Sequence, residues 1–163
     1  MELVRATPTD ERVLDRLMQL YAYDFSEFMD LDVGDDALYA LGDRIARCRT
    51  DAARHAFLGR VDGRIAGFVI VEERSRLTGA TDVMDVAEFF VMRKYRRKGI
   101  GYELASRTFD LFPRKWEVRE RSTNTPATIF WRRTIDRYTG GHFQDTVWDD
   151  DRWHGPVQSF DAT

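Results

Sequence analysis

The feature that most constrains the fold is a strand–turn–helix unit in the middle of the chain. Residues 83–92, "VMDVAEFFVM", form an apolar run typical of a buried strand. The basic, glycine-containing segment "RKYRRKGIG" follows. Residues 99–112 then carry apolar side chains at helical spacing and end near Pro113. A strand that leads directly into a helix indicates a fold that layers helices against a sheet.

The turn of this unit has the composition of an anion site. Gly99 and Gly101 have no Cβ, so their backbone can approach a ligand closely or adopt positive φ. A helix that begins here presents unpaired N–H groups and the positive end of its dipole. Three cations, Arg96, Arg97 and Lys98, precede the first glycine. Two interpretations remain open at this point: a charged, solvated turn, or a cradle for a phosphate-bearing ligand.

Two common nucleotide patterns do not fit this segment. The chain has no G-x-x-x-x-G-K-[ST] sequence. The dinucleotide pattern G-x-G-x-x-G fails at its last position, where Leu104 stands. That pattern also belongs to an early strand, whereas this turn comes late and follows a hairpin predicted by Asp62–Gly63.

The remaining elements can be read from periodicity and turn residues. We expect a single domain over residues 1–163, in the order β-α-α-β-β-β-α-β-α-β-β, with helices on the faces of a mixed sheet. The expected strands are 2–6, 55–61, 64–74, 83–92, 115–121, 142–150 and 155–162. The expected helices lie within 7–28, 35–48, 99–112 and 125–138, the last with Pro126 in its first turn and Gly140–Gly141 as its stop.

Composition excludes several classes of function. The net charge of −3, from 25 basic and 28 acidic residues, gives no reason to expect nucleic-acid binding. Cys48 is the only cysteine and the three histidines are scattered, so we expect neither a disulfide nor a metal site. The N-terminal residues are too charged for a signal peptide, and no apolar run reaches the about 18–20 residues of a membrane span. A cytoplasmic protein with no membrane partner is the expectation.

The segment "FFVMRKYRRKGIGYELA" resembles the signature of the GNAT superfamily of N-acetyltransferases. Its core R/Q-x-x-G-x-G/A is matched by residues 96–101, with Val91 at the usual valine position. Residues 124–131, "NTPATIFW", resemble the family's N-x-x-A-x-x-x-Y segment. Asn124 and Ala127 match, and Trp131 replaces the tyrosine. The resemblance is strongest over residues 83–135, and it implies a mostly antiparallel central sheet flanked by helices.

The resemblance implies a site for acetyl-CoA, without a metal, in which backbone N–H groups of the turn hold the pyrophosphate. The strand edge would hydrogen-bond the pantetheine arm, and the second segment would lie near the thioester. The implied donor-binding residues are Phe90, Val91, Met92, Arg96, Arg97, Lys98, Gly99, Ile100, Gly101, Tyr102, Asn124 and Phe130. Members of the superfamily often form dimers, so a homodimer is a further possibility.

Attack of an amine on a thioester needs a neutral amine and a proton for the leaving thiolate. The base in this superfamily is often a carboxylate on the strand before the turn, where Asp85 and Glu88 stand. A regular strand places these two on opposite faces, and a bulge would change that parity. We favour Glu88, with a solvated or ion-paired carboxylate as the alternative. Trp131 takes the place of the usual acid, and an indole cannot supply a proton at neutral pH. Trp131 either contributes to the site or packs, and water or Tyr138 could protonate the thiolate.

The acceptor is suggested by an acidic stretch. Between Arg16 and Arg44 the chain has seven acids and no basic residue. In the resembled fold this region flanks the acceptor site, so we expect a primary amine on a small cationic molecule. Tyr21, Asp24 and Glu27 lie at helical spacing and are the candidate acceptor-binding residues. The alternative for most of these acids is a solvated face. A catalytically silent acyl-CoA-binding module is the alternative function.

Overall fold

The computed structural model describes all of residues 1–163. The strands are β1 Glu2–Arg5, β2 Arg54–Val61, β3 Arg64–Glu72, β4 Val83–Val91, β5 Lys115–Arg119, β6 Phe143–Asp150 and β7 Trp153–Asp161. The helices are α1 Glu11–Phe25, α2 Arg47–Thr50, α3 Ile100–Leu111 and α4 Thr125–Thr139. Short 3-10 turns at Pro8–Asp10 and Arg93–Tyr95 precede α1 and α3. The order of elements is the predicted one.

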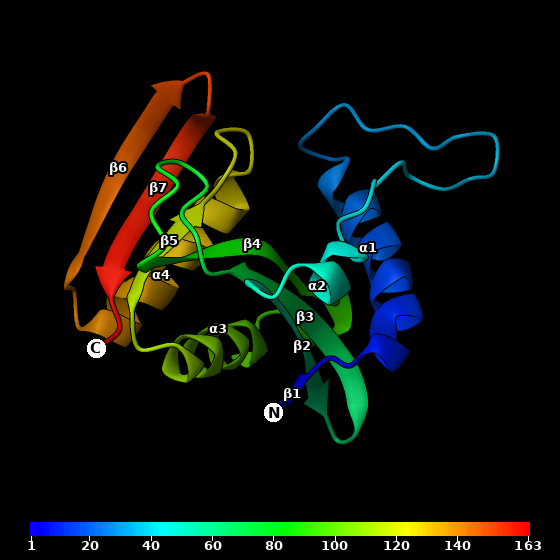
Figure 1. Ribbon diagram of the computed structural model, residues 1–163, viewed down its shortest axis with the longest axis horizontal. Coiled ribbons are helices and arrows are strands. Elements are labelled where there is room, and N and C mark those ends of the chain that lie inside the picture. Colours follow the sequence, from blue (N-terminus) through cyan, green and yellow to red (C-terminus); the bar gives the residue numbers. More distant parts are fainter.

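The strands form one seven-stranded sheet in the order β1-β2-β3-β4-β5-β7-β6. Every neighbouring pair is antiparallel except β4 and β5. Figure 1 shows β5, β6 and β7 on one side of the molecule and β2 and β3 on the other, with β4 between them. The mixed, mostly antiparallel sheet flanked by helices is therefore confirmed.

Two apolar clusters cover the two faces of the sheet. On one face, α1 packs Leu14, Leu17 and Met18 against β2, β3 and Phe90 of β4. On the other face, α3 and α4 cover a larger cluster that includes Phe109 and extends to β5 and β7. Burial of these apolar residues is the main stabilising contribution to the fold, and it fixes α1 and the start of α3 on opposite faces of β4.

The local turn chemistry agrees with the sequence. Asp62 and Gly63 both have positive φ, 50° and 72°, and join the antiparallel β2 and β3 as a two-residue hairpin turn. Pro126 lies in the first turn of α4, and Gly140 ends that helix in a left-handed conformation. No helix of the molecule has the length and apolar composition that a bilayer crossing requires.

One predicted element is wrong. The helix expected over residues 35–48 is absent, and only the four-residue α2 forms at the end of that stretch. Ala37 and Gly42 have positive φ, 60° and 65°, which a right-handed helix cannot contain. A single bridge between Val33 and Tyr39 replaces helical hydrogen bonding. Leu38 stays 51% exposed while Ile45 is buried, so the apolar residues of this stretch do not form one continuous buried face.

Candidate active site

The sheet opens at the centre of the molecule, between β4 and β5. These strands pair only at residues 83–85 with 115–117, and β4 continues to Val91 without a partner on that side. The parallel pair is the one point where the antiparallel pattern breaks, because α3 connects β4 to β5 across one face. Backbone N–H and C=O groups on this edge of β4 are therefore available to an extended ligand.

The turn at the end of β4 carries a row of free backbone donors. Between Arg97 and Tyr102 no backbone N–H meets a protein acceptor, and the first amide of α3 that does is Glu103, bonded to Gly99. Consecutive free amides at the start of a 12-residue helix are the geometry that binds phosphate. The backbone of this turn thus has the geometry that the predicted cradle for a phosphate-bearing ligand requires.

The shape of this cradle depends on two glycines and one strained residue. Gly99 has φ of 80°, and Arg97, which has a Cβ, has φ of 59°. A left-handed non-glycine residue costs about 1–2 kcal/mol, which the surrounding contacts must offset. A Cβ on Gly101 would lie 2.9 Å from the ring of Phe130, so a side chain here would have to displace that ring or the helix. The glycine spacing in the sequence thus has two different physical causes.

The cations of the turn separate into two groups. Arg97 and Lys98 are exposed and form no ion pair, so both are free for an anionic ligand. Arg96 instead turns back, donating from Nε to the carbonyl oxygen of Val91 at 2.7 Å and from its terminal nitrogen to Asp24. The side chain of Arg96 therefore supports the turn and does not face it.

An aromatic wall joins β4 to α4 beside the opening. Phe89 of β4 stacks on Phe130 at 5.5 Å and meets Trp131 edge-on at 4.7 Å between ring centroids. Trp131 is 5% exposed and belongs to the large apolar cluster. Packing is thus the role of the Trp131 ring that the geometry supports.

Other predicted donor-binding residues are already engaged in part. The N–H of Met92 donates to Ala66 on β3, which removes it from the free edge of β4. Asn124 is buried and caps α4, since its Oδ1 accepts from the N–H of Ala127 at 3.1 Å. The Asn124 amide N–H₂ remains available. Tyr102, in the first turn of α3, lies under the guanidinium of Arg137 at 3.9 Å.

Glu88 lies at a bulge in β4. Ile70 pairs with Glu88 and Val71 pairs with Val86, so Ala87 is the extra residue. The bulge changes the parity of the strand and turns Glu88 to the face covered by α1, where the side chain is 13% exposed. Burial raises the pKa of Glu88, although Arg44, 3.7 Å away, favours the charged form. A carboxylate with a raised pKa at an opening of the sheet suits proton transfer near neutral pH.

Tyr21 is the predicted acceptor residue that lies with Glu88. Its ring packs against Phe68 and Phe90. Burial and the neighbouring Glu88 carboxylate raise the pKa of the Tyr21 hydroxyl well above its usual value. Asp24 instead pairs with Arg93, in the segment between β4 and α3. Glu27 is exposed and forms no ion pair. The three residues at helical spacing therefore have three different environments.

Asp85, the other carboxylate weighed for the base, is fully buried and engaged. Arg119 donates three hydrogen bonds to its two oxygens, at 2.7, 2.9 and 3.2 Å, and the N–H of Arg76 adds a fourth. A buried carboxylate held in this way has a structural role, because removing its partner would leave an unpaired charge.

The connection between α1 and α2 reaches the site at both ends. Near its start, the carbonyl oxygen of Phe28 accepts a bond from the Thr123 hydroxyl at 3.0 Å, next to the cap of α4. Near its end, Arg44 meets Glu88. The six acids of this connection form no ion pair with any Lys or Arg; they are Glu27, Asp30, Asp32, Asp35, Asp36 and Asp43. The acidic composition of this connection was evident from the sequence, but its contacts with Thr123 and Glu88 were not.

A buried carboxyl group escaped sequence analysis. Glu120, just after β5, is 3% exposed, and its Oε1 has no partner. Gln158 of β7 donates to its Oε2 at 3.3 Å and also to Asp145 at 3.0 Å. Burial raises the pKa of Glu120 to about 8, against the hydrogen bond from Gln158. Nothing in the local sequence "VRERS" distinguishes this glutamate from a surface residue.

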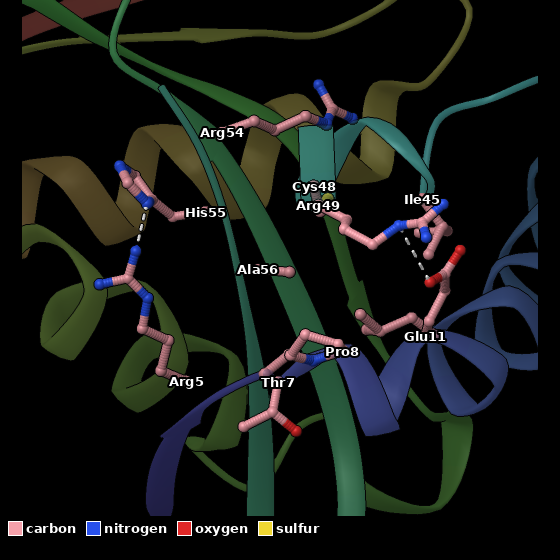
Figure 2. A pocket seen from close by; sticks show the side chains of 12 residues that line it. Arg5, Thr7, Pro8, Glu11, Ile45, Cys48, Arg49, Arg54, His55 and Ala56 are labelled. Atoms are coloured by element: carbon pink, nitrogen blue, oxygen red, sulfur yellow. Dashed lines mark hydrogen bonds and ion pairs between the residues drawn. The ribbon is translucent and has the colours of Figure 1, made fainter. Parts of the chain in front are cut away.

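A separate small hollow lies between the β1–α1 turn, α2 and β2 (Figure 2). Its volume is about 80 Å³, well below that of a typical ligand pocket. Figure 2 shows Arg5 directed to His55, at 2.7 Å, and Arg49 directed to Glu11, at 3.7 Å. Arg54, also on its wall, pairs with Glu72. Because each guanidinium already has a partner, we assign no ligand to this hollow. No group of three or more His, Cys, Asp or Glu side chains is arranged to hold a metal ion.

Solved structures share this fold across nearly the whole chain. A PaiA N-acetyltransferase from Thermoplasma acidophilum, in complex with coenzyme A, is 11% identical with a TM-score of 0.67, covering 98% of each chain. A spermidine N-acetyltransferase from Vibrio cholerae is 13% identical with a TM-score of 0.60, covering 98% of this chain and 92% of its own. An aminoglycoside acetyltransferase from an uncultured soil metagenomic sample, in complex with sisomicin, is 16% identical with a TM-score of 0.61, over 82% and 86% of the two chains.

Sequence comparison adds the family. No curated protein sequence matches the chain. The model of the acetyltransferase (GNAT) family matches residues 14–135, about three quarters of the chain, and includes the opening of the sheet, the cradle and the start of α4. With the free amides at the start of α3 and the opening of β4 from β5, this match shows that the chain belongs to the GNAT family of N-acetyltransferases.

Proposed function

We propose that the protein transfers an acetyl group from acetyl-CoA to a primary amine of a small cationic acceptor, by direct attack on the thioester. The observation that carries the proposal is that one strand–turn unit holds both groups, with Glu88 at the bulge within β4 and the free amides in the turn that follows. The first group suits an anionic donor, and the second suits a proton taken from an amine.

The donor site is built from backbone. Amides of residues 97–102 would hold the pyrophosphate, with Arg97 and Lys98 adding charge, and the free edge of β4 would hold the extended arm. The residues present fit such a donor, because Gly99 and Gly101 leave the amides uncovered. Acetyl-CoA, when bound, supplies the thioester whose C–S bond breaks as the new C–N bond forms.

Glu88 is the proposed base. A cationic amine must lose a proton before its nitrogen can attack, and the acid form of an alkylamine predominates at neutral pH. Glu88, with its pKa raised by burial, can take that proton directly or through water. The N–H groups of the β4 edge can stabilise negative charge on the thioester oxygen. The proposed reaction therefore relies on holding the two reactants together, on proton removal by Glu88 and on stabilisation of the thioester oxygen, none of which uses a metal-ligating residue.

No strong acid is required from the protein. A thiol has a pKa of about 8.5, so its thiolate is a tolerable leaving group and can be protonated by water. The hydroxyl of Tyr138, considered above as an acid, donates a hydrogen bond to Asp110 at 2.9 Å. Burial, together with this bond, raises the pKa of Tyr138 to about 12. Water is therefore the proposed proton source, and Trp131 shapes the site without donating a proton.

The acceptor proposal rests on charge. Six unpaired acids lie on a connection whose two ends reach the site, so the approach to Glu88 favours a cation. Spermidine and sisomicin, named with two structural neighbours, are polyamines and fit this class. Arg44 and Arg121 near Tyr21 would repel a cation, so the proposed acceptor has its charged part at the acidic connection and only its reacting amine at Glu88.

The proposal can be tested with the intact protein in two steps. Thermal unfolding with increasing acetyl-CoA should show a rising Tm, since a ligand that binds only the folded state stabilises it. Thiol release should then follow with spermidine or an aminoglycoside and fall with a neutral amine of similar size. Tm shifts without thiol release from any amine would contradict the enzyme and favour a silent acyl-CoA-binding module.

A further inference from the structure

The side chain of Asp24 is held entirely by the donor side of the molecule. Arg93 donates to Asp24 Oδ1 at 2.8 Å, and Arg96 donates to Oδ2. Both guanidiniums come from the segment that connects β4 to α3, while Asp24 lies in the last turn of α1. Both carboxylate oxygens are therefore occupied by protein cations, which leaves Asp24 poorly placed to attract the ammonium group of an acceptor.

Arg96 connects three parts of the site through one guanidinium. Its Nε donates to the carbonyl oxygen of Val91, the last residue of β4, and its outer nitrogen binds Asp24 of α1. Its backbone leads directly into Arg97, whose left-handed φ of 59° opens the row of free amides. A strained residue keeps its conformation only where neighbouring contacts hold it. The bonds made by Arg96 are the nearest such contacts on its N-terminal side.

Asp24 neutralises the two guanidiniums and fixes the side chain of Arg96. The Asp24 side chain is 18% exposed and faces two guanidiniums, so its charge compensates cations that would otherwise repel each other beside the cradle. Without Asp24, Arg96 would keep its bond to Val91 and its contact with the Phe90 ring, and its outer nitrogens would lose their carboxylate partner. The cradle would then lose its link to α1, the helix that also carries Tyr21 on the acceptor side.

We propose that Asp24 is a positioning residue for the donor: it clamps Arg96, and through Arg96 the left-handed turn whose amides bind the pyrophosphate, and it does not bind the acceptor. The proposal rests on the proposed acetyl-CoA-dependent function. It reverses the expectation drawn from helical spacing, which grouped Asp24 with Tyr21 and Glu27 as an acceptor-binding set. Under this proposal, the carboxylate at position 24 of α1 helps to bind the donor and not the acceptor.

The test separates donor from acceptor with three charge-matched variants on the same helix or its end. Asp24→Asn should weaken coenzyme A binding by about tenfold in isothermal titration, the loss expected for one charge-assisted hydrogen-bond network. Its acceptor KM, measured with spermidine at saturating acetyl-CoA, should stay unchanged. Glu27→Gln should leave coenzyme A binding unchanged. Asp15→Asn, an exposed change on α1, should alter neither parameter.

A double-mutant cycle provides the second readout. Arg96→Gln keeps a residue that the family motif tolerates, so we expect it to fold, and it should weaken coenzyme A binding as Asp24→Asn does. Combining the two should add little, because both remove the same clamp. Normal coenzyme A binding by Asp24→Asn, or a rise in its acceptor KM alone, would overturn the proposal. Absence of coenzyme A binding by the wild-type protein would instead overturn the proposed function itself.

Discussion

The two sides of the opening in the sheet differ in how they are built. On the donor side, β4, the glycine turn and α3 are held by backbone hydrogen bonds and by Gly99 and Gly101, whose roles follow from φ and from contact with Phe130. On the acceptor side, the connection between α1 and α2 has one isolated bridge, exposed acids and no regular element until α2. Under the proposed function, the difference means that the donor is recognised by backbone geometry and the acceptor by side-chain charge on an irregular segment.

The largest expected effect concerns the residue between the two sides. Glu88→Gln should lower kcat/KM by about 10²–10⁴, the usual contribution of a general base, and leave coenzyme A binding unchanged. Activity needs the carboxylate form, so wild-type kcat/KM should fall as pH drops through the raised pKa of Glu88. That limb of the pH profile should vanish in Glu88→Gln. Steady-state rates against pH check this, and an unchanged profile would remove Glu88 from the chemistry.

The next effect concerns stability beside the opening, at the buried Glu120 after β5. Its pKa is raised from the usual 4.5 to about 8, so between these pH values the folded protein holds a proton that the unfolded chain releases. Stability should therefore be fully present below about pH 4.5, decrease as pH rises toward 8, and level off above it; the decrease from this group is on the order of a few kcal/mol.

Glu120→Gln removes this titration and serves as the comparison. Urea unfolding at pH 5.5 and pH 8.5 should show a smaller difference in the free energy of unfolding for Glu120→Gln than for the wild-type protein. Equal pH dependence of the two proteins would mean that Glu120 titrates normally and that the neighbouring Gln158 accommodates its charge.

A smaller effect is expected at the aromatic wall. Trp131→Phe should reduce the free energy of unfolding by about 1–2 kcal/mol, because a large buried ring is replaced by a smaller one. The value of kcat should change less than threefold, since the indole supplies no proton. A kcat loss of tenfold or more, with coenzyme A binding intact, would give Trp131 a direct part in the reaction.

The smallest effect is expected on the acceptor side. Asp35→Asn combined with Asp36→Asn should raise the KM for spermidine about threefold at low salt, because exposed charges contribute little individually. Added salt should reduce the difference between variant and wild type. A KM that does not respond to these changes or to salt would make the acidic connection a solvated surface and remove the argument for a cationic acceptor.

The features that could be predicted from the sequence are those set by local backbone geometry. The hairpin at Asp62–Gly63, Pro126 and Gly140 of α4, and Gly99 of the turn were predictable because each follows a local rule of φ or helix capping. The helix over 35–48 was wrong, because Ala37 and Gly42 adopt left-handed conformations that interrupt it, although Ile45 is buried. The bulge at Ala87, the pairing of Asp24 with Arg96 and the burial of Glu120 depend on contacts between distant segments, which spacing along the chain does not contain.

The central claim is that the turn after β4 is a backbone cradle for the donor, and coenzyme A titration of the wild-type protein and Gly101→Val tests it most directly. A valine side chain would begin with a Cβ 2.9 Å from the Phe130 ring, so either that ring or the first turn of α3 would have to move. We predict 1:1 binding to the wild-type protein and about 100-fold weaker binding to a variant that still unfolds cooperatively, a loss of about 2.7 kcal/mol. Equal coenzyme A affinity of the two proteins would contradict the account.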